Sequence, residues 1–62
     1  MTNQSETHDL LLEHFNTYIE ENQKFADKGN KAAATRARKA LLEIKKLCAT
    51  RRTEIIEAKK NL

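Results

Sequence analysis

The residues best placed for chemistry form a cationic cluster just beyond the middle of the chain. Residues 28–39, with the sequence KGNKAAATRARK, hold five lysines or arginines and no acid. The start of a helix exposes unpaired backbone N–H groups that favour acids, yet this start carries Lys31 instead, so it attracts anions. Small alanines at 32–34 would let a bulky anion approach the backbone, while Thr35 and Arg36 reach around it. The cluster is therefore typical of a phosphate-binding helix start.

Further cations continue this surface along the predicted second helix. The next acid is Glu43, and a track of this length fits a polyanion better than one small ligand. No aromatic residue interrupts the track, which argues against base stacking with single strands, and the face is dominated by lysine and arginine, which favours contact with the phosphate backbone. We expect contacts with the phosphates of duplex DNA and little sequence preference, and RNA is not excluded. The predicted contact residues are Lys28, Lys31, Thr35, Arg36, Arg38, Lys39, Lys45, Lys46 and Arg52.

Other reactive side chains give no support for catalysis or cofactor binding. The chain has no Gly-rich phosphate loop and no nucleophile with a sequence-local base, so we expect no enzyme, no small-molecule substrate and no cofactor. His8 and His14 are six residues apart and do not converge on one helix face, so no metal site is expected. Cys48 is expected to serve as a small hydrophobic residue. Arg51 interrupts the same apolar series. Its charge needs an acidic partner on the first helix or on another subunit, or a position at the edge of the bundle where the side chain reaches solvent.

A helical hairpin is the architecture that positions these residues. The 62 residues include no proline and one glycine, too few of either for the turns of a sheet. Gly29 is typical of the residue that follows a helix, and Asn30 can cap the next one. We predict one all-α domain over residues 1–62: a helix over about 5–28 that begins at Ser5 or Thr7, a hinge at 29–30, and an antiparallel helix over about 31–60.

Apolar residues recur on one side of each predicted helix at steps of three and four. The series is Leu11, Leu12, Phe15, Tyr18, Ile19, Phe25 and Ala26 on the first helix, and Ala37, Leu41, Ile44, Cys48, Ile55, Ala58 and Leu62 on the second. Leu42 and Ile56 fall on the basic side instead. Since they indicate a second contact surface, we expect two hairpins to form a homodimer, as a four-helix bundle or a coiled coil.

Size and charge agree with such an assembly. A chain of 7.2 kDa with 39% hydrophobic and 34% charged residues is near the lower limit for burying its own core, which favours self-association. Residues 1–27 carry one lysine and six acids, a net charge of −5, whereas residues 28–62 carry eleven lysines or arginines and three acids, a net charge of +8. No stretch approaches the ~18 apolar residues of a membrane span, and one cysteine allows no internal disulfide. We therefore expect a cytoplasmic protein without a membrane partner.

The cationic cluster resembles the corresponding part of the bacterial linker-histone-like nucleoid proteins, including the chlamydial histone-like family. The resemblance runs through residues 28–39 and on to Leu42, Glu43 and Ile44. It implies DNA binding, association with the nucleoid and chromosome condensation, and it implies that the basic residues of the matched segment contact DNA. Ala34 stands where some relatives have glycine, and the chain is expected to be a short member without the Lys-, Ala- and Pro-rich tail of the chlamydial proteins.

Two functions stay open at this point. In the first, the basic face binds duplex DNA through its phosphates. In the second, the hairpin is a protein–protein interaction module, and its basic face docks an acidic partner or pairs with acids of another subunit. Salt-dependent binding to unrelated duplexes distinguishes the first function from the second.

Overall fold

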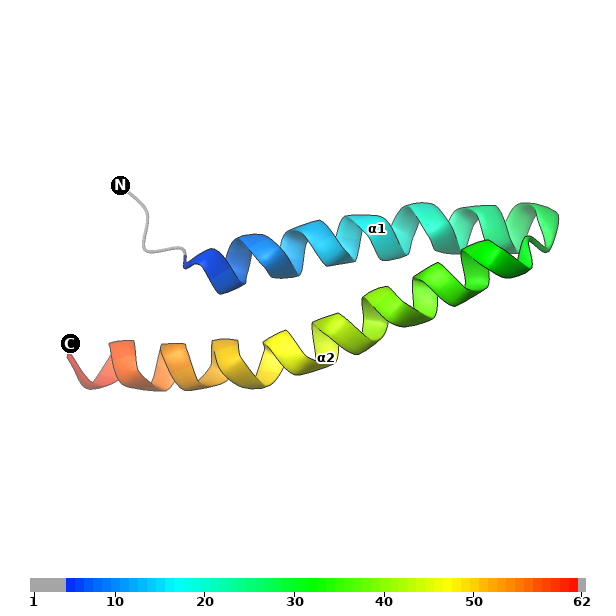
Figure 1. Cartoon of the computed structure of the whole chain (residues 1–62). Coiled ribbons are helices and arrows are strands. Elements are labelled where there is room, and N and C mark those ends of the chain that lie inside the picture. The colour runs from blue at the N-terminus through cyan, green and yellow to red at the C-terminus, as the bar shows by residue number, and fades with distance from the viewer. Residues whose placement is uncertain (1–4, 62) are drawn as a thin grey trace.

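The computed structural model describes residues 5–61 as two antiparallel helices joined by a short hinge (Figure 1). Helix α1 spans Glu6–Lys28 and helix α2 spans Lys31–Lys60. The hairpin is long and thin, with principal extents of 48 × 22 × 13 Å. The start of α1 and the end of α2 lie at the same end of the hairpin, opposite the hinge. The prediction of an all-α, antiparallel helical hairpin is confirmed.

The ends of α1 form at the residues that the sequence marks for them. Ser5 caps the helix, its Oγ accepting a hydrogen bond from the His8 N–H at 3.1 Å, so the alternative cap Thr7 lies within the helix. Gly29 adopts a left-handed conformation, with φ 63° and ψ 28°, that glycine takes without a steric penalty. Its N–H donates to the Phe25 carbonyl at 2.8 Å, which closes α1 and turns the chain into the hinge.

An inner seam of buried and half-buried side chains joins the two helices. Near the hinge it contains Ala33, Ala37 and Ala40, which are 0%, 7% and 4% exposed and are the only buried apolar residues of the described part. Alanine lets helices approach closely, and the ribbons in Figure 1 draw apart toward the open end, where larger side chains take over. The inner seam comprises Thr7, Leu11, His14, Tyr18 and Glu21 of α1 and Ala33, Ala37, Ala40, Ile44, Leu47, Arg51 and Glu54 of α2. Its alternating steps of three and four are those of a coiled coil.

Helix α2 is turned by about one residue from the orientation predicted from its apolar series. Ala37 and Ile44 lie in the inner seam, but Leu41, Cys48, Ile55 and Ala58 are exposed, and Leu62 lies outside the described residues. The reason is the short hinge, which brings the first turns of α2 so close to α1 that alanine rather than leucine must face it. Cys48, which was expected to serve as a small hydrophobic residue, is exposed on α2 and does not pack between the two helices.

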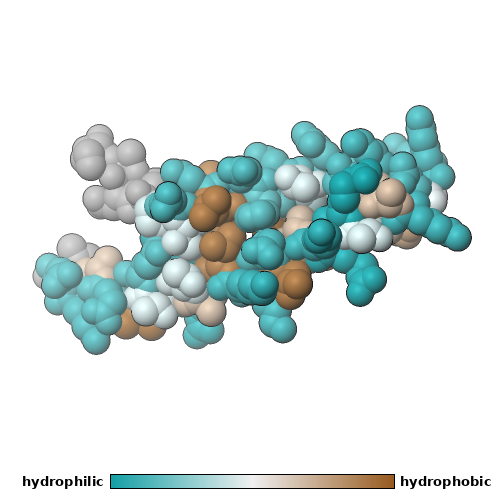
Figure 2. Space-filling model, viewed as in Figure 1, coloured by the Kyte–Doolittle hydropathy of each residue, from teal (hydrophilic) through white to brown (hydrophobic). Residues whose placement is uncertain are grey.

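Most large apolar side chains of the hairpin stay on its surface. Leu12, Phe15, Ile19 and Phe25 are 52%, 51%, 49% and 47% exposed instead of packing on α2. Leu42 and Ile56 project outward from α2 at 49% and 52% exposure, as predicted. Hydrophilic residues cover most of the face drawn in Figure 2, with a few hydrophobic ones between the helices. Within residues 5–61, neither helix combines the length and the apolar character needed to cross a bilayer.

A polar clasp joins the two helices at their open end. Glu54 accepts hydrogen bonds from Ser5 Oγ at 2.7 Å, Thr7 Oγ1 at 2.6 Å and Arg51 Nη1 at 2.9 Å. Arg51 also donates to Ser5 Oγ at 3.0 Å. Arg51 thus pairs with an acid on its own helix, rather than with an acid on the first helix.

The polar clasp makes part of the stability dependent on pH. Hydrogen bonds from Thr7, then from Ser5 and Arg51, lower the pKa of Glu54 from 4.5 to about 2. Because this pKa is lower in the folded protein than in the unfolded chain, the stabilisation is present above pH 4.5 and is lost as the pH falls from 4.5 toward 2. We expect the melting temperature, followed by circular dichroism, to fall over this range, and to fall less in the Glu54→Gln variant. Identical pH profiles for the two proteins would contradict the clasp.

Candidate nucleic-acid interface

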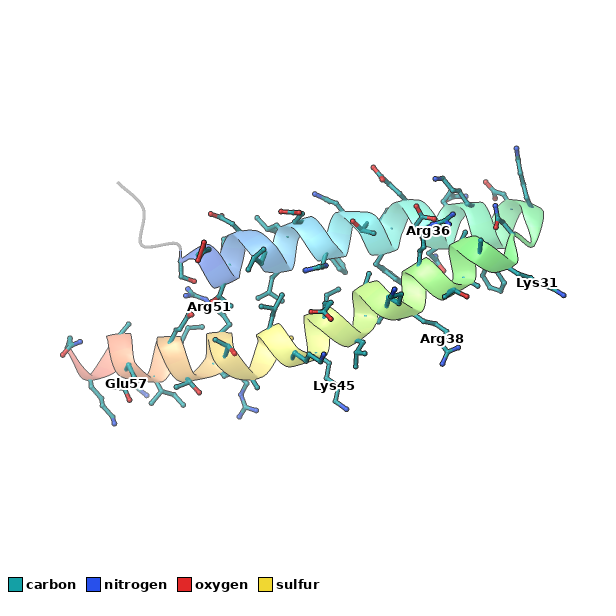
Figure 3. All side chains as sticks on the ribbon, viewed as in Figure 1. Lys31, Arg36, Arg38, Lys45, Arg51 and Glu57 are labelled. Carbon is teal, nitrogen blue, oxygen red and sulfur yellow. The ribbon has the colours of Figure 1, made fainter. Side chains whose placement is uncertain are left out.

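An evenly spaced line of cations, the outer cation row, runs along α2. It consists of Lys31, Arg38, Lys45, Arg52 and Lys59, all of them exposed. Seven residues are close to two helical turns, so neighbouring cations are about 10.5 Å apart and the whole row is about 42 Å long. Figure 3 shows Lys31, Arg38 and Lys45 extending away from α1. The row can therefore contact a ligand whose length matches that of the hairpin.

The outer cation row has no compensating acid: within residues 5–61, none of its members forms an ion pair. The first turn of α2 contains no acidic residue. The ridge beside the row is uncharged as well, and consists of Thr35, Leu42, Ala49 and Ile56. Unpaired surface charges of one sign create a positive potential that reaches about 8 Å into solvent at physiological salt, and this potential favours a polyanion.

On the other flank of α2, Arg36 is held against α1. Arg36 Nε donates to Glu21 Oε1 at 2.8 Å, and Lys24 Nζ lies 3.3 Å from the other carboxylate oxygen. Glu21 is 8% exposed, and the hydrogen bond from Arg36 is the main cause of its lowered pKa. One predicted phosphate-binding residue is thus already engaged by an acid of the same chain.

Two further cations of this flank are paired with acids one helical turn away. Lys46 Nζ lies 3.7 Å from Glu43, and Lys60 Nζ lies 3.7 Å from Glu57. Exposed pairs of this kind stabilise a helix little, but each places a negative charge where a phosphate would have to approach. Lys39 is on the same flank and forms no ion pair with the residues that the structure describes. Helix α2 therefore presents one uncompensated flank and one largely compensated flank.

The start of α2 is a less open anion site than its sequence indicates. Asn30 caps the helix as predicted, and its Oδ1 accepts the Ala33 N–H at 3.0 Å, so this donor is used within the chain. Ala33 is fully buried in the inner seam, and the Thr35 hydroxyl donates to the Lys31 carbonyl at 3.3 Å. The expectation that the alanines at 32–34 open the backbone to an anion is therefore wrong for Ala33, whereas Ala32 is exposed.

The structure places eight of the nine predicted contact residues on two flanks of α2, and the ninth, Lys28, ends α1. The outer cation row contains Lys31, Arg38, Lys45 and Arg52, with Thr35 beside them. The other flank carries Arg36, Lys39 and Lys46. Their contact with DNA stays a prediction. The sequence interpretation missed Lys59, which lies seven residues after Arg52 and could have been found by extending the spacing.

Comparison with known proteins shows that the chain is similar to a protein family. A family model described as histone H1-like protein Hc1 matches residues 5–61, which is the whole range of the hairpin described above. None of the curated proteins matches the chain, and no solved structure does.

Proposed function

The chain belongs to the histone H1-like Hc1 family of DNA-binding proteins, and we propose that it binds duplex DNA through the phosphates, along the outer cation row of α2. In this proposal residues 1–62 act as one helical-hairpin domain. Such binding associates the protein with the nucleoid and contributes to chromosome condensation. A homodimer is the form in which we expect it to act.

The observation that carries the proposal is the absence of acids along the outer cation row within residues 5–61. Duplex DNA carries one charge per ~1.7 Å of its axis, so each cation of the row can approach a phosphate without displacing an acid of the protein. The row is about 42 Å long, which exceeds one turn of the duplex, ~34–36 Å. Its two ends can therefore reach phosphates on successive turns.

The side chains beside the row support binding with little sequence preference. The uncharged ridge offers two aliphatic side chains, Leu42 and Ile56, and the small residues Thr35 and Ala49. Base edges are read chiefly by paired hydrogen bonds from arginine, asparagine or glutamine placed deep in the major groove. This surface has no asparagine or glutamine within the described part of α2, and its two arginines, Arg38 and Arg52, are 14 residues apart.

A salt titration tests the proposal directly. We expect the full chain to bind two duplexes of unrelated sequence with equal affinity, measured by fluorescence anisotropy. If all five cations of the row contact phosphates, the slope of log K against log salt concentration is about −4.5, because each contact contributes ~0.9. No binding at 0.15 M salt would contradict the proposal and favour docking to an acidic protein. An RNA duplex in the same series measures the preference between the two nucleic acids.

A further inference from the structure

The uncharged ridge of α2 runs between cations, and Leu42 is the clearest case. On a helix, the side chains nearest to a residue are those three and four positions away. Around Leu42 these are Arg38, Lys39, Lys45 and Lys46, so every such neighbour is cationic. Leu42 itself is 49% exposed. A polyanion bound by the surrounding cations therefore lies over an aliphatic side chain.

Ile56 repeats this arrangement further along the ridge. It lies 14 residues after Leu42, which is ~21 Å along the helix, and it is 52% exposed. Its neighbours at three and four positions are Arg52, Thr53, Lys59 and Lys60, three of which are cationic. An aliphatic side chain with cations around it thus occurs twice beside the outer cation row.

A shallow groove on α2 brings both kinds of side chain to one ligand. It is lined by Thr35, Arg38, Lys39, Leu41, Leu42 and Lys45. Its three cations form no ion pair with the residues of the described hairpin, and Figure 3 shows Arg38 and Lys45 extending away from α1. A ligand that fits this groove has anionic groups with apolar surface between them.

The backbone of duplex DNA meets both requirements. Its phosphates are anionic, and the deoxyribose between two successive phosphates consists mainly of carbon. Phosphate and sugar alternate along each strand, so a surface that binds the phosphates also meets the sugars. A second copy of the chain does not fit the ridge through the same surface, because the cations of both copies would lie together.

We propose that Leu42 and Ile56 pack against deoxyribose sugars of the duplex, and that this contact makes the protein prefer DNA to RNA. The inference rests on the proposed function, because the cations of the row must hold the phosphates for the ridge to reach the sugars. It adds a second kind of contact to that function, since the cations attract either nucleic acid and the aliphatic side chains distinguish between them.

The 2′-hydroxyl of ribose is the group that the ridge disfavours. This hydroxyl is both a donor and an acceptor, and it is the group by which a protein distinguishes RNA from DNA. Packed against leucine or isoleucine, it loses water and gains no hydrogen bond, which is unfavourable. Ala49 offers no polar side-chain group, and the Thr35 hydroxyl already donates to the Lys31 carbonyl at 3.3 Å. The ridge therefore has little with which to satisfy a ribose.

Contact with sugars agrees with binding that has little sequence preference. Every nucleotide of DNA carries the same deoxyribose, so Leu42 and Ile56 meet the same group at each base pair. The ridge thus selects the type of nucleic acid, whereas it leaves the base sequence unread.

Three duplexes of one sequence test the inference: DNA, RNA, and RNA with fluorine in place of each 2′-hydroxyl. The fluorinated duplex keeps the A-form geometry of RNA but lacks the hydroxyl, so it separates the shape of the helix from the chemistry of the sugar. We expect the full chain at 0.15 M salt, followed by fluorescence anisotropy, to bind DNA about tenfold more tightly than RNA. The fluorinated duplex should bind within about threefold of DNA.

A pair of double variants assigns the preference to the ridge. The variant Leu42→Gln, Ile56→Gln supplies amides that can bond to a ribose hydroxyl, so the DNA-to-RNA affinity ratio should fall from about tenfold to about twofold or less. Glutamine retains a good helix propensity, so α2 should stay helical.

The control makes the same change on α1. Leu12 and Ile19 are 52% and 49% exposed, like Ile56 and Leu42, but none of their neighbours at three and four positions is lysine or arginine. The variant Leu12→Gln, Ile19→Gln should keep the DNA-to-RNA ratio of the native chain. Any effect of this variant on folding or assembly acts on both duplexes alike, and therefore leaves the ratio unchanged.

The outcomes separate this inference from the proposed function. Equal or tighter binding of RNA, or a fluorinated duplex that binds as weakly as RNA, overturns the sugar contact and leaves phosphate binding intact. The same loss of preference in both double variants also overturns it. Failure to bind any of the three duplexes overturns the proposed function, and the inference with it.

Discussion

Replacing Arg38, Lys45 and Arg52 together by alanine is expected to weaken duplex binding about 100-fold at 0.15 M salt. Each phosphate contact contributes ~0.9 to the slope of log K against log salt, so the loss of three contacts changes the slope from about −4.5 to about −1.8. The effect should be the same for duplexes of unrelated sequence, because phosphates carry no sequence information. Fluorescence anisotropy over 0.05–0.3 M salt measures both quantities.

The other flank of α2 provides a control with the same loss of charge. Replacing Lys39, Lys46 and Lys60 by alanine removes three cations, two of which lie 3.7 Å from an acid of the same chain. We expect this variant to lose less than tenfold in affinity, since a paired cation releases fewer counterions from DNA. Equal losses in the two triple variants would show that total charge, and not the uncompensated row, determines binding. Circular dichroism must show unchanged helicity in both.

A large loss of stability is expected when Ala33 is replaced by leucine. Ala33 is 0% exposed and faces α1 in the first turn after the hinge, where the chain leaves the helices little freedom to move apart. Overfilling such a site costs roughly 1–3 kcal/mol. For a domain of this size, ~1 kcal/mol changes the melting temperature by ~4–8 °C, so thermal denaturation followed by circular dichroism detects the effect clearly.

The neighbouring alanine is the control for this substitution. Ala32 is exposed, and leucine has a helix propensity close to that of alanine, so Ala32→Leu should change the melting temperature by only ~2 °C or less. If the Ala33→Leu variant melts at the same temperature as the Ala32→Leu variant, the helices do not lie as close together near the hinge as described here. The pair also separates packing from propensity, since both variants make the same chemical change.

The hairpin could be predicted from a few residues with strong local preferences. Gly29 and Asn30 mark the hinge because one accepts a left-handed backbone and the other caps a helix with its side chain. Ser5 marks the beginning of α1 in the same way. These effects act within one helical turn, so they are visible in the sequence without any knowledge of the partner helix.

The orientation of α2 could not be predicted in the same way. The sequence contains two apolar series one residue apart: one through Ala33, Ala37 and Ala40, and one through Leu41 and Ile55. Hydrophobicity alone favours the series with leucine and isoleucine. In the structure the alanine series faces α1 instead. The short hinge holds the first turns of α2 close to α1, and only small side chains fit between helices that lie so close together.

The candidate interface was likewise visible only in part. The number of cations and their side of the helix follow from the sequence, but their compensation depends on contacts across the hairpin. Arg36 is the clearest case, because its partner Glu21 lies 15 residues away in the chain and 2.8 Å away in space. Lys59 shows the opposite, since its membership of the outer cation row follows from spacing alone.

The absence of base-reading contacts along the outer cation row has a kinetic consequence. A duplex repeats its phosphates at every base pair, so a displacement by one rise of ~3.4 Å, with the matching rotation, returns all five cations to equivalent phosphates. The energy then varies little with position along the DNA, and no single location traps the protein. Such a surface suits one-dimensional diffusion, in which the protein slides to vacant stretches and redistributes along the chromosome without dissociating.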